Sequence, residues 1–171
     1  MVPINPVAPG TVGGAPASKM LVIVPCGSRK IWDKEPGHGP ALARDAYIGP
    51  MFQANSAYAL CFADRWVILS AKYGLTAPDD VIPEAYNVTF KEPDTHPVSL
   101  DTIRAQITAR GLDHHDHVIG LGGVAYRNIV ACAFADFDCD VHFPFTGLSI
   151  GRYIQRVKRA TGNDDPYGEK M

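Results

Sequence analysis

Four short apolar runs, separated by stretches with helical periodicity, constrain the fold of this chain more than any other feature. The runs cover residues 20–24, 65–70, 117–123 and 139–145. Short β-branched runs bounded by turn residues are typical of strands that are buried on both faces of a sheet. Helical patterns occupy residues 41–63, 99–111, 124–135 and 147–162, and Leu60 is among the residues of the first that are expected to face inward. Residues 31–40 are expected to form a loop, and residues 76–98 a long irregular excursion in which residues 85–90 could form a short edge strand. The alternation of apolar runs and helical patterns predicts a single α/β domain, in which a mostly parallel sheet of about four or five strands carries helices on both faces.

The boundaries of that domain follow from composition. The chain has 171 residues, of which 46% are hydrophobic, enough for one core. Residues 1–18 are rich in proline and glycine and lack the pattern of a signal peptide, so we expect a flexible N-terminal arm. We expect the catalytic domain over residues 19–162 and a C-terminal tail over residues 163–171. No apolar run is long enough to predict a membrane helix.

Charge and cysteine content limit the partners and the compartment. The chain has 16 basic and 18 acidic residues, a formal net charge of −2. That balance argues against a non-specific nucleic-acid binder. A protein that binds DNA through one local basic face can still have such a net charge. Four cysteines without a C-x-x-C spacing indicate reduced thiols in a cytoplasmic protein. We expect no membrane association and no obligate protein partner.

Three segments are predicted to meet at one edge of the sheet, because ligands of such sheets bind outside the carboxyl ends of the strands. These segments read "PCGSRK", "SAKYGL" and "GLGGVAY" and follow the first, second and third apolar runs. Ser70 ends the second run and adds a hydroxyl group to this edge. We expect these segments to form a pocket that binds an anionic, nucleotide-like ligand.

The first of these segments combines a flexible backbone with positive charge. Gly27 lets a ligand approach the backbone, Ser28 offers a hydroxyl group, and Arg29 and Lys30 supply cations. A turn with solvated cations explains the same residues equally well. Cys26 fits a small buried thiol better than a nucleophile, because no histidine partner can be assigned.

The second segment brings cations, an aromatic ring and two carboxylates. Lys72 and Tyr73 are candidate ligand-binding residues, and Gly74 is a natural turn. Asp79 and Asp80 are candidates for positioning a water molecule or for stabilising a positive transition state. The alternative is a proline turn in which Asp79 only caps the backbone.

The third segment is a glycine turn. Gly122 and Gly123 do not complete the G-x-G-x-x-G frame of a dinucleotide site, so we predict no cofactor. We expect the turn to pack closely against a ligand, with Tyr126 one helical turn further on.

Histidines do not predict a metal site. The segment "DHHDH" at residues 113–117 fits a solvated loop at the amino edge and lacks the spaced ligand set of zinc sites. His142 lies in the fourth apolar run and could reach the ligand-binding edge of the sheet, but a structural histidine explains it more simply. We therefore predict no metal.

The last helix is amphipathic and basic. Ile150, Ile154 and Val157 recur at helical spacing and are expected to face the core. Arginines form a second stripe on this helix, next to the apolar one: Arg152, Arg156 and Arg159. This stripe is predicted either to contact DNA phosphates or to be a solvated face.

Two motifs resemble known families. "PCGSRK" followed by "ILSAKYGLTAPDDVIPEAYNVTF" resembles a small family of bacterial and phage proteins with the patterns P-C-[GS]-x-x-K and L-S-A-x-Y-G-L-x-x-P-x-x-x-I-x-x-Y. The second segment is also similar to the YaaA peroxide-stress family. That pattern is filled here by Tyr73, Gly74, Leu75, Pro78, Asp80, Ile82 and Tyr86, of which the last stands one residue late. The first segment also resembles the P-C-S-x-x-K segment of archaeosine-synthase-type proteins, which modify a base in RNA.

The resemblance implies an enzyme that handles nucleobases in DNA. Some relatives look like DNA glycosylases that excise 5-hydroxymethylcytosine or a similar pyrimidine, as a defence against phage with altered DNA. We therefore expect a metal-free N-glycosylase, with Asp79 or Asp80 stabilising the positive sugar and Lys30 or Lys72 stabilising the departing base. Candidate aromatic platforms for a flipped base are Trp32, Tyr73, Tyr86 and Tyr126.

Three alternatives remain open from the sequence. A lysine could attack the sugar and form a Schiff base. A YaaA-like protein would bind DNA without catalysis, and its binding would be sensitive to salt. A hydrolase of free nucleotides is the third alternative, which the near-neutral charge favours.

Overall fold

The structure is a computed structural model that describes residues 18–169. The predicted N-terminal arm therefore lies outside the described residues, except for Ser18. In chain order the strands and α-helices are β1 (Met20–Pro25), α1 (Ile31–Lys34), β2 (Ala41–Leu42), α2 (Ala43–Ala46), α3 (Pro50–Phe62), β3 (Arg65–Ser70), β4 (Gly74–Thr76), β5 (Val81–Ile82), α4 (Leu100–Ala109), β6 (His117–Gly120), α5 (Val124–Phe134), β7 (Asp140–His142) and α6 (Ile150–Gly162).

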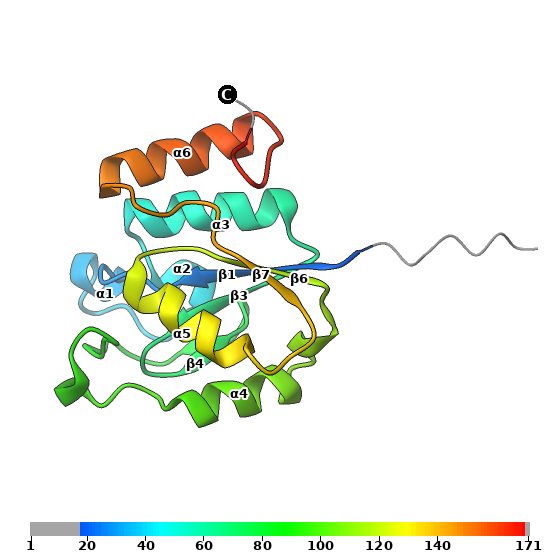
Figure 1. Cartoon of the computed structure of the whole chain (residues 1–171). Coiled ribbons are helices and arrows are strands. Elements are labelled where there is room, and N and C mark those ends of the chain that lie inside the picture. The colour runs from blue at the N-terminus through cyan, green and yellow to red at the C-terminus, as the bar shows by residue number, and fades with distance from the viewer. Residues whose placement is uncertain (1–17, 170–171) are drawn as a thin grey trace, which may run out of the picture.

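Five strands form the central sheet in the order β4-β3-β1-β6-β7. Strand β1 is parallel to β3 and β6, and β7 is parallel to β6. Only β4 runs antiparallel, beside β3 at the edge. The four parallel strands thus end at one edge, at the left of Figure 1. This arrangement confirms the predicted fold class.

Helices cover both faces of the sheet. Helices α3 and α6 lie over one face, and α4 and α5 lie over the other (Figure 1). In the central strand, Val22 and Val24 pack toward α3 and α6, whereas Leu21 and Ile23 pack toward α4 and α5. All four are at most 1% exposed, which explains why this run is apolar without alternation.

Helix α4 follows the sequence prediction closely. The Ser99 side chain accepts a hydrogen bond from the Thr102 backbone N–H at 3.1 Å and so caps the helix. Ile103 and Ile107 are buried against the sheet. Gly111 follows the helix with a φ of +65°, the left-handed conformation that glycine adopts readily.

Some local predictions were wrong. Residues 31–40, expected to be a loop, contain α1, and the helical stretch expected from residue 41 opens with β2. Residues 85–90 form no strand; the short strand of this excursion is β5, which pairs with β2. Leu60 and Ile150, expected inside, are 72% and 69% exposed, because each lies on the outer side of its helix.

The segment after α6 packs back on the domain. The Tyr58 hydroxyl donates a hydrogen bond to the Pro166 carbonyl, and the Tyr167 ring lies edge-on to His142 at a centroid distance of 5.4 Å. None of the helices within residues 18–169 has both the length and the apolar character that a membrane crossing needs.

Candidate functional site

A polar cluster forms where the loops after β1, β3 and β6 meet the excursion that follows β5. Tyr86 lies at its centre: the Lys30 Nζ atom is 4.5 Å from the centre of the Tyr86 ring, and Tyr73 packs edge-on against that ring at 5.4 Å. Beside them, Cys26 Sγ lies 3.5 Å from the Tyr126 hydroxyl. We call this group the Lys30 cluster, and it consists of Cys26, Lys30, Tyr47, Ser70, Tyr73, Tyr86 and Tyr126.

Lys30 is the buried cation of the cluster, with only 8% of its surface exposed. Its backbone N–H donates to Asp33 Oδ2 at 2.8 Å, and its Nζ donates to the Ser28 carbonyl at 3.2 Å. Burial lowers the pKa of Lys30 below its usual value, while Cys26 and Asp33 act in the opposite direction. At a given pH, a larger fraction of Lys30 is therefore in the neutral amine form than of a lysine on the surface.

Ser70 positions Tyr86 through a chain of hydrogen bonds. The buried Ser70 Oγ accepts the backbone N–H groups of Lys72 at 3.2 Å and of Tyr73 at 3.1 Å. Both lone pairs of the hydroxyl are then used, so Ser70 donates its proton to the Tyr86 hydroxyl at 2.8 Å. Tyr86 in turn is hydrogen-bonded to the Tyr47 hydroxyl. This chain fixes the ring that lies beneath the Lys30 amine.

Burial keeps three of the four tyrosine hydroxyls of the cluster protonated, those of Tyr47, Tyr86 and Tyr126. Loss of solvation is the largest cause that raises the pKa of Tyr47, Tyr86 and Tyr126, and the nearby Cys26 raises each further. Tyr126 also packs edge-on against Phe90 at 5.3 Å. The cluster therefore offers neutral phenol groups, which donate hydrogen bonds, and aromatic faces.

Gly74 and Gln106 hold Tyr73 in place. Gly74 has a φ of +76°, and a Cβ atom there would lie 2.1 Å from Gln106 Oε1. The Gln106 side chain donates to the Tyr73 carbonyl at 2.9 Å and accepts from the Leu75 N–H at 2.8 Å. The turn predicted at Gly74 is thus present. Gln106 was missed; it lies beside the apolar stripe of α4 that contains Ile103 and Ile107.

Gly122, in the glycine turn after β6, packs against protein, so the expected close approach of a ligand is not possible at this position. Gly122 has a φ of +98°, and a Cβ atom there would lie 2.5 Å from Pro25 Cγ. Its N–H donates to the Tyr153 hydroxyl at 2.8 Å, and that hydroxyl donates to Asn55 Oδ1 at 2.9 Å. Burial raises the pKa of Tyr153 to about 12. Gly123, by contrast, is exposed at the start of α5.

Asp79 and Asp80 lie at the other end of the sheet, so the structure does not place a carboxylate of this pair in the Lys30 cluster. Strand β4 runs back along β3 and carries them toward the amino edge. Asp79 pairs with Arg44, and Asp80 Oδ2 accepts from Arg110 and from the Ala77 N–H, both at 2.8 Å. Both carboxylates are thus engaged in local ion pairs.

The remaining predicted residues divide into buried and exposed groups. Trp32 is 7% exposed and its Nε1 donates to the His38 carbonyl at 2.8 Å, so it supports the loop and is not an open platform. Ser28 and Arg29 are exposed, and Gly27 is partly exposed with no heavy atom closer than 3.8 Å to a built Cβ. Lys72 is exposed, with its Nζ 5.3 Å from the Tyr73 ring centre.

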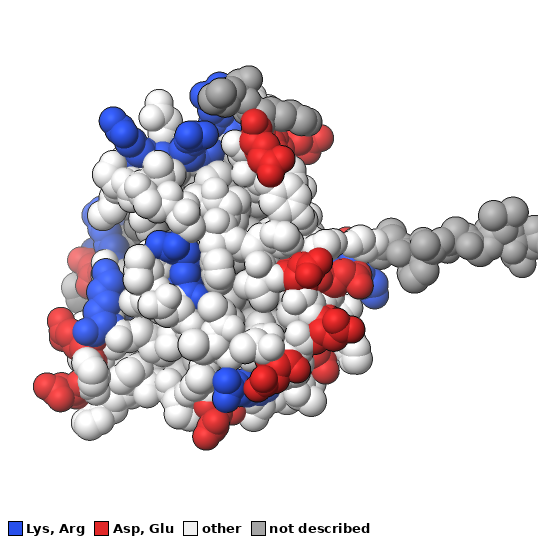
Figure 2. Space-filling model, in the orientation of Figure 1, with Lys and Arg blue, Asp and Glu red and all other residues white. Residues whose placement is uncertain are grey.

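The basic stripe of α6 is on the surface. Figure 2 shows basic side chains along the top of the molecule, where α6 lies. The predicted phosphate-contacting residues are all exposed, and none takes part in an ion pair within residues 18–169; they are Arg152, Arg156 and Arg159.

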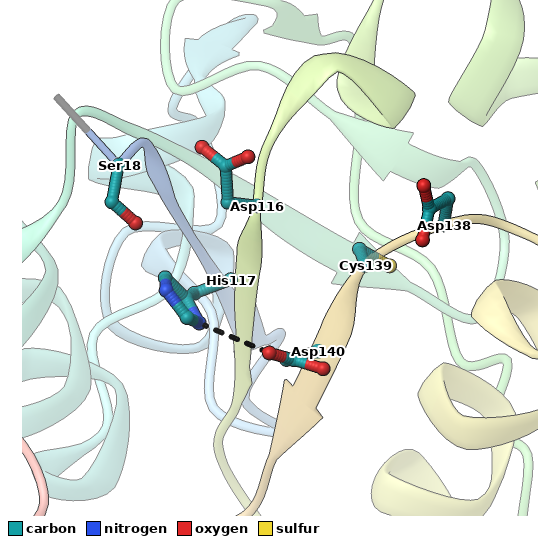
Figure 3. A pocket seen from close by; sticks show the side chains of 6 residues that line it. All are labelled: Ser18, Asp116, His117, Asp138, Cys139 and Asp140. Carbon is teal, nitrogen blue, oxygen red and sulfur yellow. Dashed lines mark ion pairs between the residues drawn. The ribbon is translucent and has the colours of Figure 1, made fainter. Parts of the chain in front are cut away.

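Two described cavities lie away from the Lys30 cluster. One, of about 430 Å³, opens at the amino ends of β6 and β7 and is lined by Ser18, Asp116, His117, Asp138, Cys139 and Asp140 (Figure 3). The other, of about 360 Å³, lies beside Arg44 and Asp79. His142, expected to be a lone structural histidine, forms a group with His117 and Asp140 that has the donor types of a metal site.

The fold and the cluster together define an α/β protein with a polar site at the carboxyl edge of a parallel sheet. The chain belongs to the family described as "Family of unknown function (DUF6884)", which it matches over residues 21–159. It is 38% identical over 143 residues to the "Uncharacterized protein YfjM" of Bacillus subtilis (strain 168), an alignment that covers 83% of this chain and 95% of that protein. No solved structure matches the chain.

Proposed function

We propose that the protein is a DNA N-glycosylase that excises a modified pyrimidine, with 5-hydroxymethylcytosine as the first candidate, and that the Lys30 cluster is its active site. The observation that carries the proposal is a buried lysine amine over the Tyr86 ring, with the Tyr73 ring packed against Tyr86, at the edge where sheets of this class bind ligands. The resemblance of "PCGSRK" and of the segment around Tyr73 and Tyr86 to nucleobase-handling families supports the same conclusion.

Lys30 is the proposed nucleophile, because neither Asp79 nor Asp80 lies in the cluster and burial favours the neutral amine. Its Nζ attacks C1′ of the deoxyribose while the bond from C1′ to the base breaks. The base leaves with the electron pair and takes a proton from solvent. A proton from Nζ moves to the ring oxygen as the sugar opens to a Schiff base, and water then hydrolyses this imine to release Lys30 and an abasic site.

The tyrosines are proposed to receive the base after it leaves the stack. Glycosylases rotate the target nucleotide out of the duplex and hold the base between aromatic groups with hydrogen bonds to its edge. The rings of Tyr73, Tyr86 and Tyr126 are only partly buried, so each keeps some surface for a ligand. The neutral hydroxyls of Tyr86 and Tyr126 would form hydrogen bonds with the base.

The surface around the cluster suits a bent duplex. Val124 and Ile150 stand at the first positions of α5 and α6 and are 61% and 69% exposed. Both helices begin at the carboxyl edge of the sheet (Figure 1). Exposed apolar side chains can insert between base steps, and the arginine stripe of α6 would contact the phosphates. The four cysteines, none of which forms a disulfide in residues 18–169, fit the cytoplasm as the proposed compartment.

A panel of duplexes tests the proposed function. Each duplex contains one cytosine, 5-methylcytosine, 5-hydroxymethylcytosine or 5-hydroxymethyluracil, and abasic sites are measured after incubation with excess protein. We expect abasic sites in the duplex with 5-hydroxymethylcytosine and none in the cytosine control. Salt-sensitive binding without base release would favour the YaaA-like alternative, and cleavage of nucleoside monophosphates alone would favour a nucleotide hydrolase.

A further inference from the structure

Two histidines and one aspartate gather on the β6–β7 edge of the sheet, far from the Lys30 cluster. His117 begins β6, and Asp140 and His142 lie on β7. The parallel register pairs His117 with Asp140 and Ile119 with His142. Residues two positions apart on a strand share a face, so Asp140 and His142 project to the same side. Their donor atoms and that of His117 all lie within 4.8 Å of one another.

The His117 ring has an unused donor atom directed at this group. Its Nδ1 is buried and has no hydrogen-bond partner within the described residues. The nearest carboxylate oxygen, Asp140 Oδ2, is 3.9 Å away, beyond hydrogen-bond range. Figure 3 shows the His117 ring directed toward Asp140, whereas the carboxylate of Asp116 points away from that ring. A buried nitrogen without a partner is costly, and a bound cation would satisfy it.

We propose that His117, Asp140 and His142 bind one divalent transition-metal ion. Two imidazoles and one carboxylate are a donor set that suits zinc and neighbouring metals, whereas magnesium and calcium prefer oxygen ligands alone. Tetrahedral coordination at about 2.1 Å requires donor atoms about 3.4 Å apart, so small side-chain rotations suffice to close the group. Water molecules would complete the coordination.

The surroundings favour entry of a cation. The cavity of about 430 Å³ at this edge gives access from solvent to His117 and Asp140. Asp116 and Asp138 line the same cavity and add negative charge. Figure 2 shows acidic side chains gathered at the right of the view, over the amino ends of the strands. A metal ion here would link the short edge strand β7 to β6, and, through the Tyr167 ring beside His142, would support the segment after α6.

Isothermal titration of the tag-free, full-length protein with Zn²⁺ tests the proposal. We expect one site per chain, no competition by excess Mg²⁺, and a weakening of at least about 100-fold in His117→Ala and in His142→Ala. His114→Ala is the matched control, because this neighbouring histidine is 80% exposed at its side chain and lies outside the group. It should bind as the unmodified protein does.

Two further measurements make the result decisive. A variant with Cys61→Ser and Cys132→Ser should retain the site, which rules out binding to exposed thiols. Co²⁺ should give visible absorption bands of a low-symmetry site that are lost in His117→Ala. Equal Zn²⁺ affinity in His117→Ala, His142→Ala and His114→Ala, or no binding by the folded protein, would overturn the proposal. It does not depend on the glycosylase proposal, because its readouts need no DNA.

Discussion

The carboxyl edge of the sheet holds a buried amine among tyrosine rings, whereas the amino edge holds carboxylates in ion pairs and two histidines. Strands β1, β3 and β6 lead into the cluster at the carboxyl edge, and β6 and β7 carry the histidines. The difference arises from the connections: the loops after the parallel strands bring their polar residues to one edge, while β4 carries Asp79 and Asp80 back to the other. Residues that are close in the sequence "SAKYGLTAPDD" therefore lie at opposite edges of the sheet, with Tyr73 at one edge and Asp79 and Asp80 at the other.

Replacing the amine should have the largest effect on the proposed reaction. We expect Lys30→Met to lower base release at least about 100-fold, because methionine keeps most of the side-chain volume but has no nucleophilic nitrogen. The measurement is the single-turnover rate on the duplex that the panel identifies. Lys34→Met in α1, the short helix that follows Lys30, is the control, since Lys34 is exposed, and its rate should be unchanged. Equal rates in both variants would remove Lys30 from the active site.

Stability should respond sharply at Gly74. Both Gly74 and Gly147 have positive φ angles, +76° and +70°, but a Cβ atom meets Gln106 only at Gly74 and finds open space at Gly147. Gly147→Ala should cost about 1 kcal/mol of unfolding free energy from backbone strain. Gly74→Ala should cost about 1–3 kcal/mol more, because the side chain of Gln106 must move. Urea denaturation measures both, and equal losses would show that Gln106 does not constrain the turn.

Lys30 and the buried tyrosines should change the stability of the protein in opposite directions as pH rises. Because burial lowers the pKa of Lys30, its charged form destabilises the fold at low pH, and this cost disappears as pH rises toward the unfolded pKa of 10.5. The stability of the unmodified protein relative to Lys30→Met should therefore rise between pH 7 and pH 10.5. Denaturation at several pH values measures this, and a constant difference would contradict the pKa shift.

The buried tyrosines should act in the opposite direction. Their folded pKa values are raised, so their stabilising effect is complete below pH 10 and is lost as pH rises through the folded values. Tyr153, with a pKa of about 12, should lose its proton within reach of experiment. We expect the stability of the protein to fall above pH 10, and less steeply in Tyr153→Phe. Identical slopes for both proteins above pH 10 would contradict this.

Asp80 should have the smallest effect on the reaction. Its carboxylate pairs with Arg110 at the amino edge, so we expect Asp80→Asn to leave the rate of base release within about twofold. Loss of this half-exposed ion pair should lower the unfolding free energy by about 1 kcal/mol or less. A tenfold loss of rate in a folded variant would show that Asp80 reaches the active site, against the geometry described above.

The sequence predicted the sheet and part of the polar cluster at its carboxyl edge, because buried strands and their exits have local signals. Lys30 and Tyr73 were expected at one edge, and both contact the Tyr86 ring. The direction of β4 has no such signal: it depends on the hairpin at Gly74, which is held by Gln106 from a distant helix. The carboxylates were misplaced for that reason.

Other site residues could not be predicted because they depend on packing between distant segments. Tyr47 follows a helical pattern, and only the folded chain shows its hydroxyl bonded to Tyr86. Asn55 and Tyr153 meet across α3 and α6 in the same way. His117 and His142 are 25 positions apart (142 − 117), and only the pairing of β6 with β7 brings them together.

Borohydride trapping tests the central claim most directly. The protein is incubated with a 5-hydroxymethylcytosine duplex and sodium borohydride, and the cross-linked residue is located by mass spectrometry. If the amine at the carboxyl edge attacks the sugar, a stable adduct forms at Lys30 and is absent in Lys30→Met. Base release that proceeds without any adduct, or an adduct at another lysine that survives in Lys30→Met, would contradict it.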